Sequence, residues 1–326
     1  MPSPGPHPLV SVIVPAWNAE GTLRETLESA AAQTHGHLEI LIVDDGSTDG
    51  TAEIAAEFCA SEPRARLIRT KNGGLSSARN VAMDAAQGGF IAPLDADDLW
   101  HPEKIERQLA TFAASSPQVG LVYCWYRVID EQGRVIEPPW MPIFEGRVFG
   151  RHLECNFGTG SSPLIRLSAL GDLRYSIELS RPGDGGCEDW LLQLQIAARN
   201  EIACTRAFLL GYRQRPRAMS ADKERMIRAH IHMYRIIQRD FPGHGTRIVR
   251  RELARWRVAR ALAMLRRQAP GNAFAELAGA FAEAPFIAGK TVVSSLVPRP
   301  NRSGRPGVVE GRPPAPAFHS LSPDSP

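Results

Sequence analysis

The sequence predicts an α/β fold with a mostly parallel sheet that helices cover on both faces. From Leu9 onward, short apolar runs alternate with amphipathic stretches of helical length, as in right-handed βαβ units. The apolar runs, such as LEILIV at 38–43, show little alternation, which is typical of strands buried on both faces. With 43% hydrophobic and 22% charged residues, the chain has the composition of a globular protein.

Each element of the first half follows from a local pattern. The first helix places Leu23, Leu27 and Ala30 at helical spacing, and Asn18 is its expected N-cap. The last helix of this half has Pro102 in its first turn, where proline is favoured. The predicted order is strand 9–15, helix 18–34, strand 38–45, helix 51–61, strand 65–70, helix 75–87, strand 89–95 and helix 102–115.

The second half is less regular. A long strand at 119–130 turns at Gly133, and the Gly- and Pro-rich region 138–184 predicts loops and short elements. A helix at 187–200 and a strand at 201–213 follow. We therefore expect four parts: an N-terminal extension at 1–8, the α/β domain at 9–215, a helical region at 216–297, and a disordered Pro-, Gly- and Ser-rich tail at 298–326.

The cysteines and the hydropathy of the chain indicate in which cellular compartment the protein is expected. Five scattered cysteines without a CxxC pair fit neither a disulfide framework nor a zinc site, so we expect reduced thiols. The first residues lack the basic and apolar segments of a secretory signal, and no apolar run reaches the roughly 18 residues of a membrane-spanning helix. These features predict a cytoplasmic protein.

Carboxylates stand at the ends of two predicted strands. Asp44 and Asp45 end the strand 38–45, and DADD at 95–98 follows another. Ligands of open parallel sheets bind at the carboxyl ends of the strands, and alternation puts Asp95 and Asp97 on one side. Oxygen ligands without histidine or cysteine favour Mg²⁺ or Mn²⁺, with a substrate diphosphate completing the coordination. The alternative is a surface turn with solvated acids.

Three known phosphate or metal motifs are absent. The EF-hand pattern begins well at Asp45, Ser47 and Asp49, but Ala56 occupies the twelfth position, where glutamate is required. The chain has no GxxxxGK[ST] loop, and PAWNAEG at 15–21 replaces a GxGxxG fingerprint after the first strand. Calcium-loop, P-loop and dinucleotide-binding classes are therefore excluded.

The segment TKNGGLSSARN at 70–80 lies between the acidic strand ends. Gly73 and Gly74 allow a close approach of backbone to ligand, and the following helix N-terminus attracts anions. Arg79 could fork onto a phosphate or a base carbonyl. An ordinary arginine on a surface helix is the alternative.

Four segments in order carry a family resemblance. They are SVIVPAWNAEGTL, ILIVDDGSTDGT, NGGLSSARNVAMDAAQGGFIAPLDADD and CEDWLLQLQIA. Together they resemble the inverting family 2 glycosyltransferases of the GT-A fold over residues 9–215. Each segment alone is weak, but the ordered set with suitable elements between is specific.

The resemblance implies a nucleotide-sugar site. Asp45 would accept from the uracil N3–H or a ribose hydroxyl, since an ionised carboxylate is an acceptor only. Arg79 would approach the base and phosphates, Asp95 would lie near the ribose, and Asp97 would bind the divalent cation, Mn²⁺ or Mg²⁺. The residues implied for the donor are Pro15, Ala16, Glu20, Asp45, Arg79 and Asp95, with Arg213 and Arg215 after the last strand.

The pair in CEDW resembles the acidic pair that supplies the family's catalytic base. Asp189 would take the proton of the acceptor hydroxyl, with Glu188 beside it on the acceptor side. Trp190 is either a stacking face for sugar or a core residue. Two acids at a helix N-terminus are also explained by the helix dipole alone.

The segment GYRQRPRAMSAD at 211–222 departs from the family pattern. Arg215 stands where histidine is usual, which puts a histidine–metal contact in doubt and implies a cationic clamp on the diphosphate. The frequent GGFDE is also missing ahead of the acidic pair, so the acceptor is not identified.

The region 222–267 is strongly basic, with 13 Lys or Arg against 4 Asp or Glu. Its helix at 246–267 could lie on an anionic membrane surface, which suits a lipid-linked acceptor. Because its apolar residues form two stripes, packing on the catalytic domain is the alternative. No recognised module accompanies the charge, so nucleic acid is not an expected partner. The stripes are Val249, Leu253 and Trp256, and Val258, Leu262 and Leu265.

The sequence thus predicts a metal-dependent inverting glycosyltransferase. It would move a sugar from a nucleotide-sugar donor, UDP-linked, to a saccharide or lipid-linked acceptor in surface polysaccharide assembly. Two alternatives stay open, a nucleotidyltransferase and a catalytically silent nucleotide-sugar-binding protein. The first would need a basic phosphate loop, which PAWNAEG does not offer.

Overall fold

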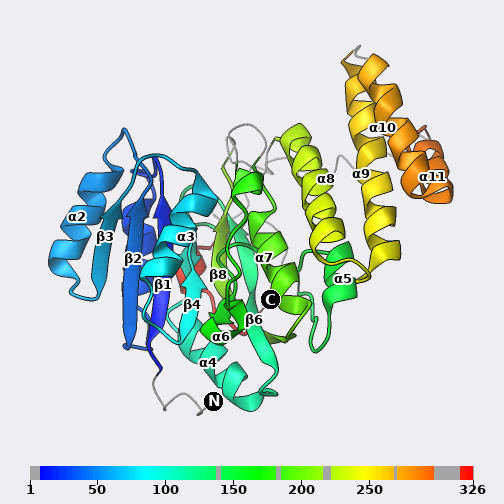
Figure 1. The fold of residues 1–326 in the computed structure, drawn as a ribbon. Coiled ribbons are helices and arrows are strands. Elements are labelled where there is room, and N and C mark those ends of the chain that lie inside the picture. Colours follow the sequence, from blue (N-terminus) through cyan, green and yellow to red (C-terminus); the bar gives the residue numbers. More distant parts are fainter. Residues whose placement is uncertain are drawn as a thin grey trace.

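A computed structural model describes residues 8–136, 141–180, 185–215, 222–267, 270–296 and 316–325. An eight-stranded sheet forms the centre of the α/β domain, and a group of helices extends from one side of it (Figure 1). The strands are β1 Val10–Ala16, β2 Leu38–Asp44, β3 Ala65–Arg69, β4 Phe90–Pro93, β5 Leu99–Trp100, β6 Val119–Ile129, β7 Leu164–Arg166 and β8 Glu201–Arg213.

Helices follow most strands, as the alternating pattern predicts. Those of the α/β domain are α1 Leu23–Ala31, α2 Thr51–Ser61, α3 Leu75–Ala85, α4 Lys104–Ala114, α5 Phe149–Glu154, α6 Leu167–Leu170 and α7 Glu188–Ala197. The helical region contains α8 Lys223–Asp240, α9 Thr246–Arg266, α10 Pro270–Glu283 and α11 Pro285–Leu296. Two short 3₁₀ turns are Ile177–Ser180 and Phe318–Ser320.

The sheet is parallel in its first half and mixed in its second. The strand order is β3-β2-β1-β4-β7-β6-β8-β5, with β3, β2, β1 and β4 parallel. In the other half β7 runs antiparallel to β4 and β6, while β6 and β8 are parallel. The expected mostly parallel sheet is therefore confirmed for the first four strands. The three-residue strand β7 lies in the region 138–184, for which the sequence predicts loops and short elements. The strand itself was not predicted, because so short a strand has no periodic pattern.

Both faces of the sheet are buried, which explains its continuous apolar strands. Along β1, Val12 packs with Leu23 and Leu27 of α1 in one hydrophobic cluster. Ile13, which points the other way, packs with Ala78 of α3 and Leu192 of α7 in a second cluster. Alternate side chains of this one strand thus pack into two hydrophobic cores, one on each face of the sheet.

The first helix begins later than its sequence signal. Asn18 has a left-handed φ of 47° and does not cap α1, which starts at Leu23. Instead, Asn18 Oδ1 accepts from the amide of Thr48 at 2.9 Å, and the amide of Asn18 donates to Ser47 Oγ at 3.1 Å. The predicted cap is wrong because these long-range contacts keep residues 17–22 in a loop at the strand ends.

Helix α9 is packed on two sides. Val249 and Leu253 are buried in a cluster with α8, and Val258 is buried in another with α10 and α11. Several of its arginines are paired, for example Arg257 and Arg260 with Glu276 of α10 at 3.1 and 2.9 Å. The two apolar stripes therefore face two sets of neighbouring helices. None of the helices in the described ranges is long and apolar enough to cross a membrane.

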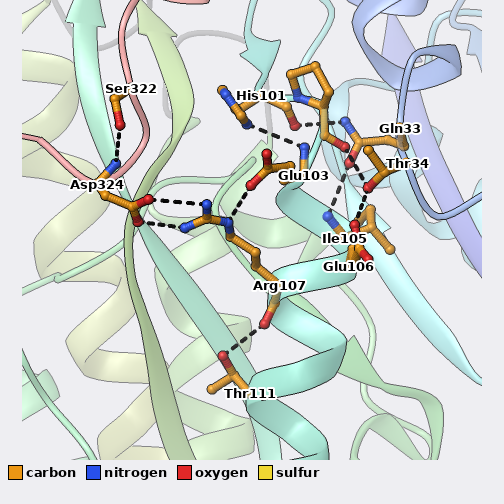
Figure 2. Close-up of polar contacts among 11 residues, drawn as sticks. Gln33, Thr34, His101, Glu103, Ile105, Glu106, Arg107, Thr111, Ser322 and Asp324 are labelled. Carbon is orange, nitrogen blue, oxygen red and sulfur yellow. Dashed lines mark hydrogen bonds and ion pairs between the residues drawn. The ribbon is translucent and has the colours of Figure 1, made fainter.

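Of the expected disordered tail at 298–326, residues 298–315 and 326 lie outside the described residues, whereas 316–325 have a defined place in the fold. Residues 316–325 lie against the α/β domain, and the Phe318 side chain is only 2% exposed. The Asp324 carboxylate pairs with Arg107 of α4, and Figure 2 shows this contact. Composition predicts disorder because it averages over the tail, whereas one buried phenylalanine and specific backbone hydrogen bonds order this short segment.

Candidate active site

A cleft of about 1200 Å³ lies at the carboxyl ends of β1, β2 and β4. Asp45, Asp97 and Asp189 all line it, although 144 positions separate the first from the last. The predicted residues Pro15, Ala16, Asp45, Arg79, Asp95, Asp97, Glu188, Asp189, Trp190, Arg213 and Arg215 belong to this lining. The convergence follows from the parallel strands, whose carboxyl ends meet at one edge.

Asp45 is fixed by backbone amides. Its two carboxylate oxygens accept from the amides of Gly73 and Gly74, each at 2.8 Å, and Oδ1 also accepts from Thr70 Oγ1 at 3.2 Å. Gly74 has a left-handed φ of 85°, which a residue with a side chain rarely adopts. The Gly-Gly pair therefore orients the strand-end acid and leads into α3.

Arg79 bridges the acids of two distant elements. It is 1% exposed, and its guanidinium donates to Asp95 Oδ1 at 2.5 Å and to Glu188 Oε1 at 2.9 Å. Asp95 follows β4 and Glu188 opens α7, so this arginine connects the acids after β4 to the acidic pair of α7. Sequence reasoning assigned Arg79 to the donor, but the structure commits both terminal nitrogens to protein carboxylates.

Asp97 and Asp98 have different surroundings, as alternation predicts. Asp97 Oδ2 accepts from Arg215 at 2.6 Å at the cleft. Asp98 is 1% exposed, and its carboxylate accepts from Ser161 Oγ at 2.6 Å and from the Arg213 amide at 2.9 Å. Burial, followed by the negative charge of Asp95, raises the pKa of Asp97. Burial, followed by the charges of Asp97 and Asp95, raises the pKa of Asp98 well above its ordinary value.

The acidic pair stands in the first turn of α7, where the helix dipole favours negative charge. The preceding Cys187 has a left-handed φ of 64° that turns the chain into the helix. Burial, followed by the charge of Glu188, raises the pKa of Asp189 to about 7, while Arg79 opposes the shift. A carboxylate with this pKa can exchange protons near neutral pH.

Three predicted residues have structural partners. Glu20 is exposed and is not among the described residues that line the cleft. Its Oε2 instead accepts from the amide of Gly50, before α2, at 2.8 Å. The Arg213 side chain is fully buried and donates to Glu25 Oε2 and to the Asp97 carbonyl at 2.6 and 2.7 Å. Trp190 is 6% exposed and donates to the His152 carbonyl at 3.0 Å, as a core tryptophan does.

The sequence did not point to several other lining residues. Gly160 lies so close to the acids that an added Cβ would be 2.7 Å from Asp95 Oδ2. The run of small residues GTGSS at 158–162 could have indicated such a close approach in the sequence. Ser161 Oγ also accepts from the Asp95 amide at 3.0 Å. The others include Trp17, Asn72, Tyr126, Glu131, Asn156, Tyr212, Arg225, Met226 and His230.

The donor set fits a hard divalent cation. Asp95 and Asp97 are carboxylates in one cleft, and the charge of Asp95 contributes to the raised pKa of Asp97, an effect that a cation would relieve. Within the described ranges no group of three or more His, Cys, Asp or Glu could hold a metal by itself. One or two carboxylates completed by diphosphate and water is the arrangement that Mg²⁺ commonly adopts.

Replacing Arg79 by Met should lower the free energy of unfolding by about 3–5 kcal/mol, because the change leaves the carboxylates of Glu188 and Asp95 without their counter-charge. The double variant Arg79→Met/Glu188→Met should recover part of this loss. Urea denaturation measures both. The control Arg174→Met, from an exposed pair with Asp84, should cost less than about 1 kcal/mol. Equal losses for the two single variants would contradict the bridging role.

Comparison with known proteins places the chain in a family. Residues 11–174, half of the chain, match the family model described as glycosyl transferase family 2. The chain is 41% identical over 129 residues to chondroitin synthase of Escherichia coli, covering 40% of this chain and 19% of that protein. It is 44% identical over 103 residues to the putative teichuronic acid biosynthesis glycosyltransferase TuaG of Bacillus subtilis, covering 31% and 41%.

An uncharacterized glycosyltransferase of Rickettsia felis is 35% identical over 194 residues, covering 59% of this chain and 31% of that protein. The chain thus matches less than half the length of each of these relatives. Among solved structures, S. aureus TarS 1–349 has a TM-score of 0.62 at 21% identity, covering 88% of this chain and 84% of that chain. Other TarS 1–349 structures are complexes with UDP and UDP-GlcNAc.

The mannosyltransferase PcManGT from Pyrobaculum calidifontis, in complex with GDP-Man and Mn²⁺, has a TM-score of 0.60 at 21% identity and covers 90% of this chain and 83% of that chain. These structural likenesses identify the fold, and the family match identifies the sequence group. The chain has the GT-A fold and belongs to glycosyltransferase family 2.

Proposed function

We propose that the chain is an inverting, metal-dependent glycosyltransferase. It transfers a sugar from a nucleotide-sugar, UDP-linked, to a hydroxyl of a saccharide or lipid-linked acceptor during surface polysaccharide synthesis on the cytoplasmic side of the membrane. The observation that carries this proposal is the shared cleft of Asp45, Asp97 and Asp189. A relative named for teichuronic acid biosynthesis and another named chondroitin synthase support the polysaccharide role.

The nucleoside is assigned to the β1 and β2 end of the cleft. An ionised carboxylate offers about four acceptor positions, and the recorded donors to Asp45 use three of them. The remaining position suits the uracil N3–H or a ribose hydroxyl. Pro15 and Ala16 line this end, and the exposed Trp17 offers an aromatic face to the base.

The diphosphate is assigned to the region of Asp97 and Arg215. Asp97, with Asp95 beside it, would hold Mn²⁺ or Mg²⁺, whose charge stabilises the departing diphosphate when the ion is bound. Arg215 is half-buried and supplies a guanidinium that suits phosphate oxygens. The neighbouring Arg213 orients the Asp97 backbone through its contact with the carbonyl.

Asp189 is assigned as the general base. Inversion requires a carboxylate to accept the proton of the acceptor hydroxyl while that oxygen attacks the anomeric carbon. The raised pKa of Asp189, about 7, makes its carboxylate a stronger proton acceptor than an ordinary aspartate. Glu188 stays bound to Arg79, which positions the acidic pair, and the charge of Arg79 opposes the protonation of Asp189.

Asp97→Ala should abolish the Mn²⁺-dependent part of the thermal stabilisation by UDP. The native chain should gain about 2.7 kcal/mol of stability at ligand concentrations a hundred times Kd. A thermal-shift series with UDP, GDP and EDTA measures the effect. The control Asp84→Ala, on an exposed residue of α3, should keep the full shift. A shift by GDP and not by UDP would contradict the assigned nucleotide.

Asp189→Asn should keep the UDP and Mn²⁺ shift but reduce the release of UDP from a UDP-sugar by about 10²–10⁴-fold. In the native chain kcat/KM should rise about tenfold per pH unit below pH 7 and then level off, because the base acts only when deprotonated.

For the Asp189→Asn comparison the control is Glu178→Gln, which changes an acid at an exposed position. Retained turnover in Asp189→Asn would refute the assignment of the base, and absent turnover in the native chain would favour a silent binding protein.

Peripheral membrane association is proposed through the helical region, but through α10 and α11 and not through the basic helix at 246–267 that the sequence suggested. Most apolar side chains of the α9 stripes are covered by neighbouring helices, and only Leu265 among them is strongly exposed, at 43%. By contrast, Phe274, Phe281 and Phe286 on α10 and α11 are 70%, 44% and 81% exposed. Exposed phenylalanines on helices that pack against the basic helix α9 suit the interface of an anionic bilayer.

The double variant Phe274→Ser/Phe286→Ser should therefore lose flotation with vesicles of anionic phospholipid. Ile177→Ser, which changes a 60% exposed residue elsewhere, should retain it. Vesicle flotation of the native chain and both variants is the measurement. Equal flotation of all three would rule out this surface.

A further inference from the structure

The last described residues form a strap across one border of the α/β domain. This C-terminal strap, residues 316–325, follows the turn after β6, the edge of β8 and then α4. It lies outside the family match at 11–174.

The first part of the strap closes on the turn after β6. The Phe318 side chain packs with Leu99 of β5 and Ile129 of β6 in a small buried cluster. Its amide donates to the Gly133 carbonyl at 2.9 Å, and the Val135 amide donates to the Pro316 carbonyl at 3.0 Å. The turn is thus held from both its backbone and its apolar side.

The second part attaches to β8 and α4. The Phe208 amide donates to the Pro323 carbonyl at 2.7 Å, which satisfies a backbone donor of β8. Arg107 Nη1 donates to Asp324 Oδ1 at 2.5 Å, and Arg107 Nε donates to Glu103 (Figure 2). Arg127 of β6 also donates to the carbonyl of Ser325.

The turn under the strap reaches the cleft through Arg213. Arg213 Nη1 donates to the Glu131 carbonyl at 2.6 Å, and Nε donates to the Asp97 carbonyl at 2.7 Å. On β8, a Cβ added to Gly211 would lie 3.2 Å from the ring of Phe318. The strap, the turn, Arg213 and the Asp97 loop are therefore in continuous contact.

We propose that the strap is a positioning element for the metal-binding loop. By fixing the turn at 130–135, Phe318 keeps the Glu131 carbonyl where it orients Arg213, and Arg213 holds the backbone of Asp97. None of the described strap residues lines the cleft, so its effect would pass through the turn and Arg213. This inference rests on the proposed function, because it assumes that Asp97 binds the cation.

The strap is assigned to its own chain. Residues 297–315 connect α11 to the strap, and 19 extended residues span up to about 60 Å. A globular chain of 326 residues has a radius of gyration of roughly 20 Å, so this connection suffices. Exchange of the strap between two copies would instead make a dimer that depends on it.

The test compares the native chain with a variant that ends at residue 315 and with Phe318→Ala. Titration with Mn²⁺ at saturating UDP, followed by thermal shift, should show a midpoint about five- to tenfold higher for both variants, as expected for a typical coupling between sites. A synthetic peptide of residues 314–326 should restore the midpoint of the shortened chain. The Phe318→Ala peptide should not restore it. Phe286→Ala, at an exposed phenylalanine of α11, is the matched control and should be unchanged.

The outcomes separate the two proposals. An unchanged Mn²⁺ midpoint in both variants would overturn the positioning role while leaving the proposed function intact. A native chain that shows no Mn²⁺-dependent shift with UDP would overturn the function itself, and direct binding of a fluorescent 314–326 peptide would still report whether the strap docks. A native dimer that becomes a monomer on truncation would overturn docking within one chain.

Discussion

The bridge made by Arg79 is the interaction on which the site depends. Its guanidinium holds Asp95, from the end of β4, and Glu188, from the start of α7, although 93 positions separate the two acids. A charge that is 1% exposed is stable only with such partners, and two acids at close range need a cation between them. The bridge therefore sets the distance between the acids after β4 and the acidic pair at the start of α7.

The acids around this bridge differ because their surroundings differ. Asp98 is enclosed by Ser161 and the backbone of β8, so burial favours its neutral form. Asp97 faces the cleft and pairs with Arg215, which favours its charged form against the effect of burial. For Asp189, burial and the charge of Glu188 raise the pKa to about 7 while Arg79 opposes them, so both its charged and its neutral form are accessible near neutral pH. Side chains of one chemical type thus differ enough to suit the proposed roles, Asp98 as a structural contact, Asp97 as a metal ligand and Asp189 as a base.

The sequence predicts the features that depend on local patterns. Continuous apolar runs identified β1, β2, β4 and β8, and acids at strand ends identified the cleft. The family resemblance added the proposed base, Asp189, and the proposed metal ligand, Asp97, and both roles stay predictions. Features that depend on distant partners were not predictable. Glu20 is drawn away by the Gly50 amide, and Arg213 is enclosed by carbonyls from a turn more than eighty residues earlier. Phe318 is buried in a tail whose composition predicts disorder.

Arg213 and Arg215 show why neighbouring residues of one type can have opposite roles. Arg213 ends β8 with its side chain fully buried and donors directed at Asp97, Glu131 and Glu25, so moving it would leave several acceptors unpaired. Arg215 lies two residues beyond, and its pair with Asp97 has side chains that are 37% and 24% exposed. This pair is more open to solvent than the fully buried Arg213, so its partners can be exchanged at lower cost. In the proposed reaction Arg215 turns to the diphosphate and Asp97 to the cation, while Arg213 keeps the loop in place.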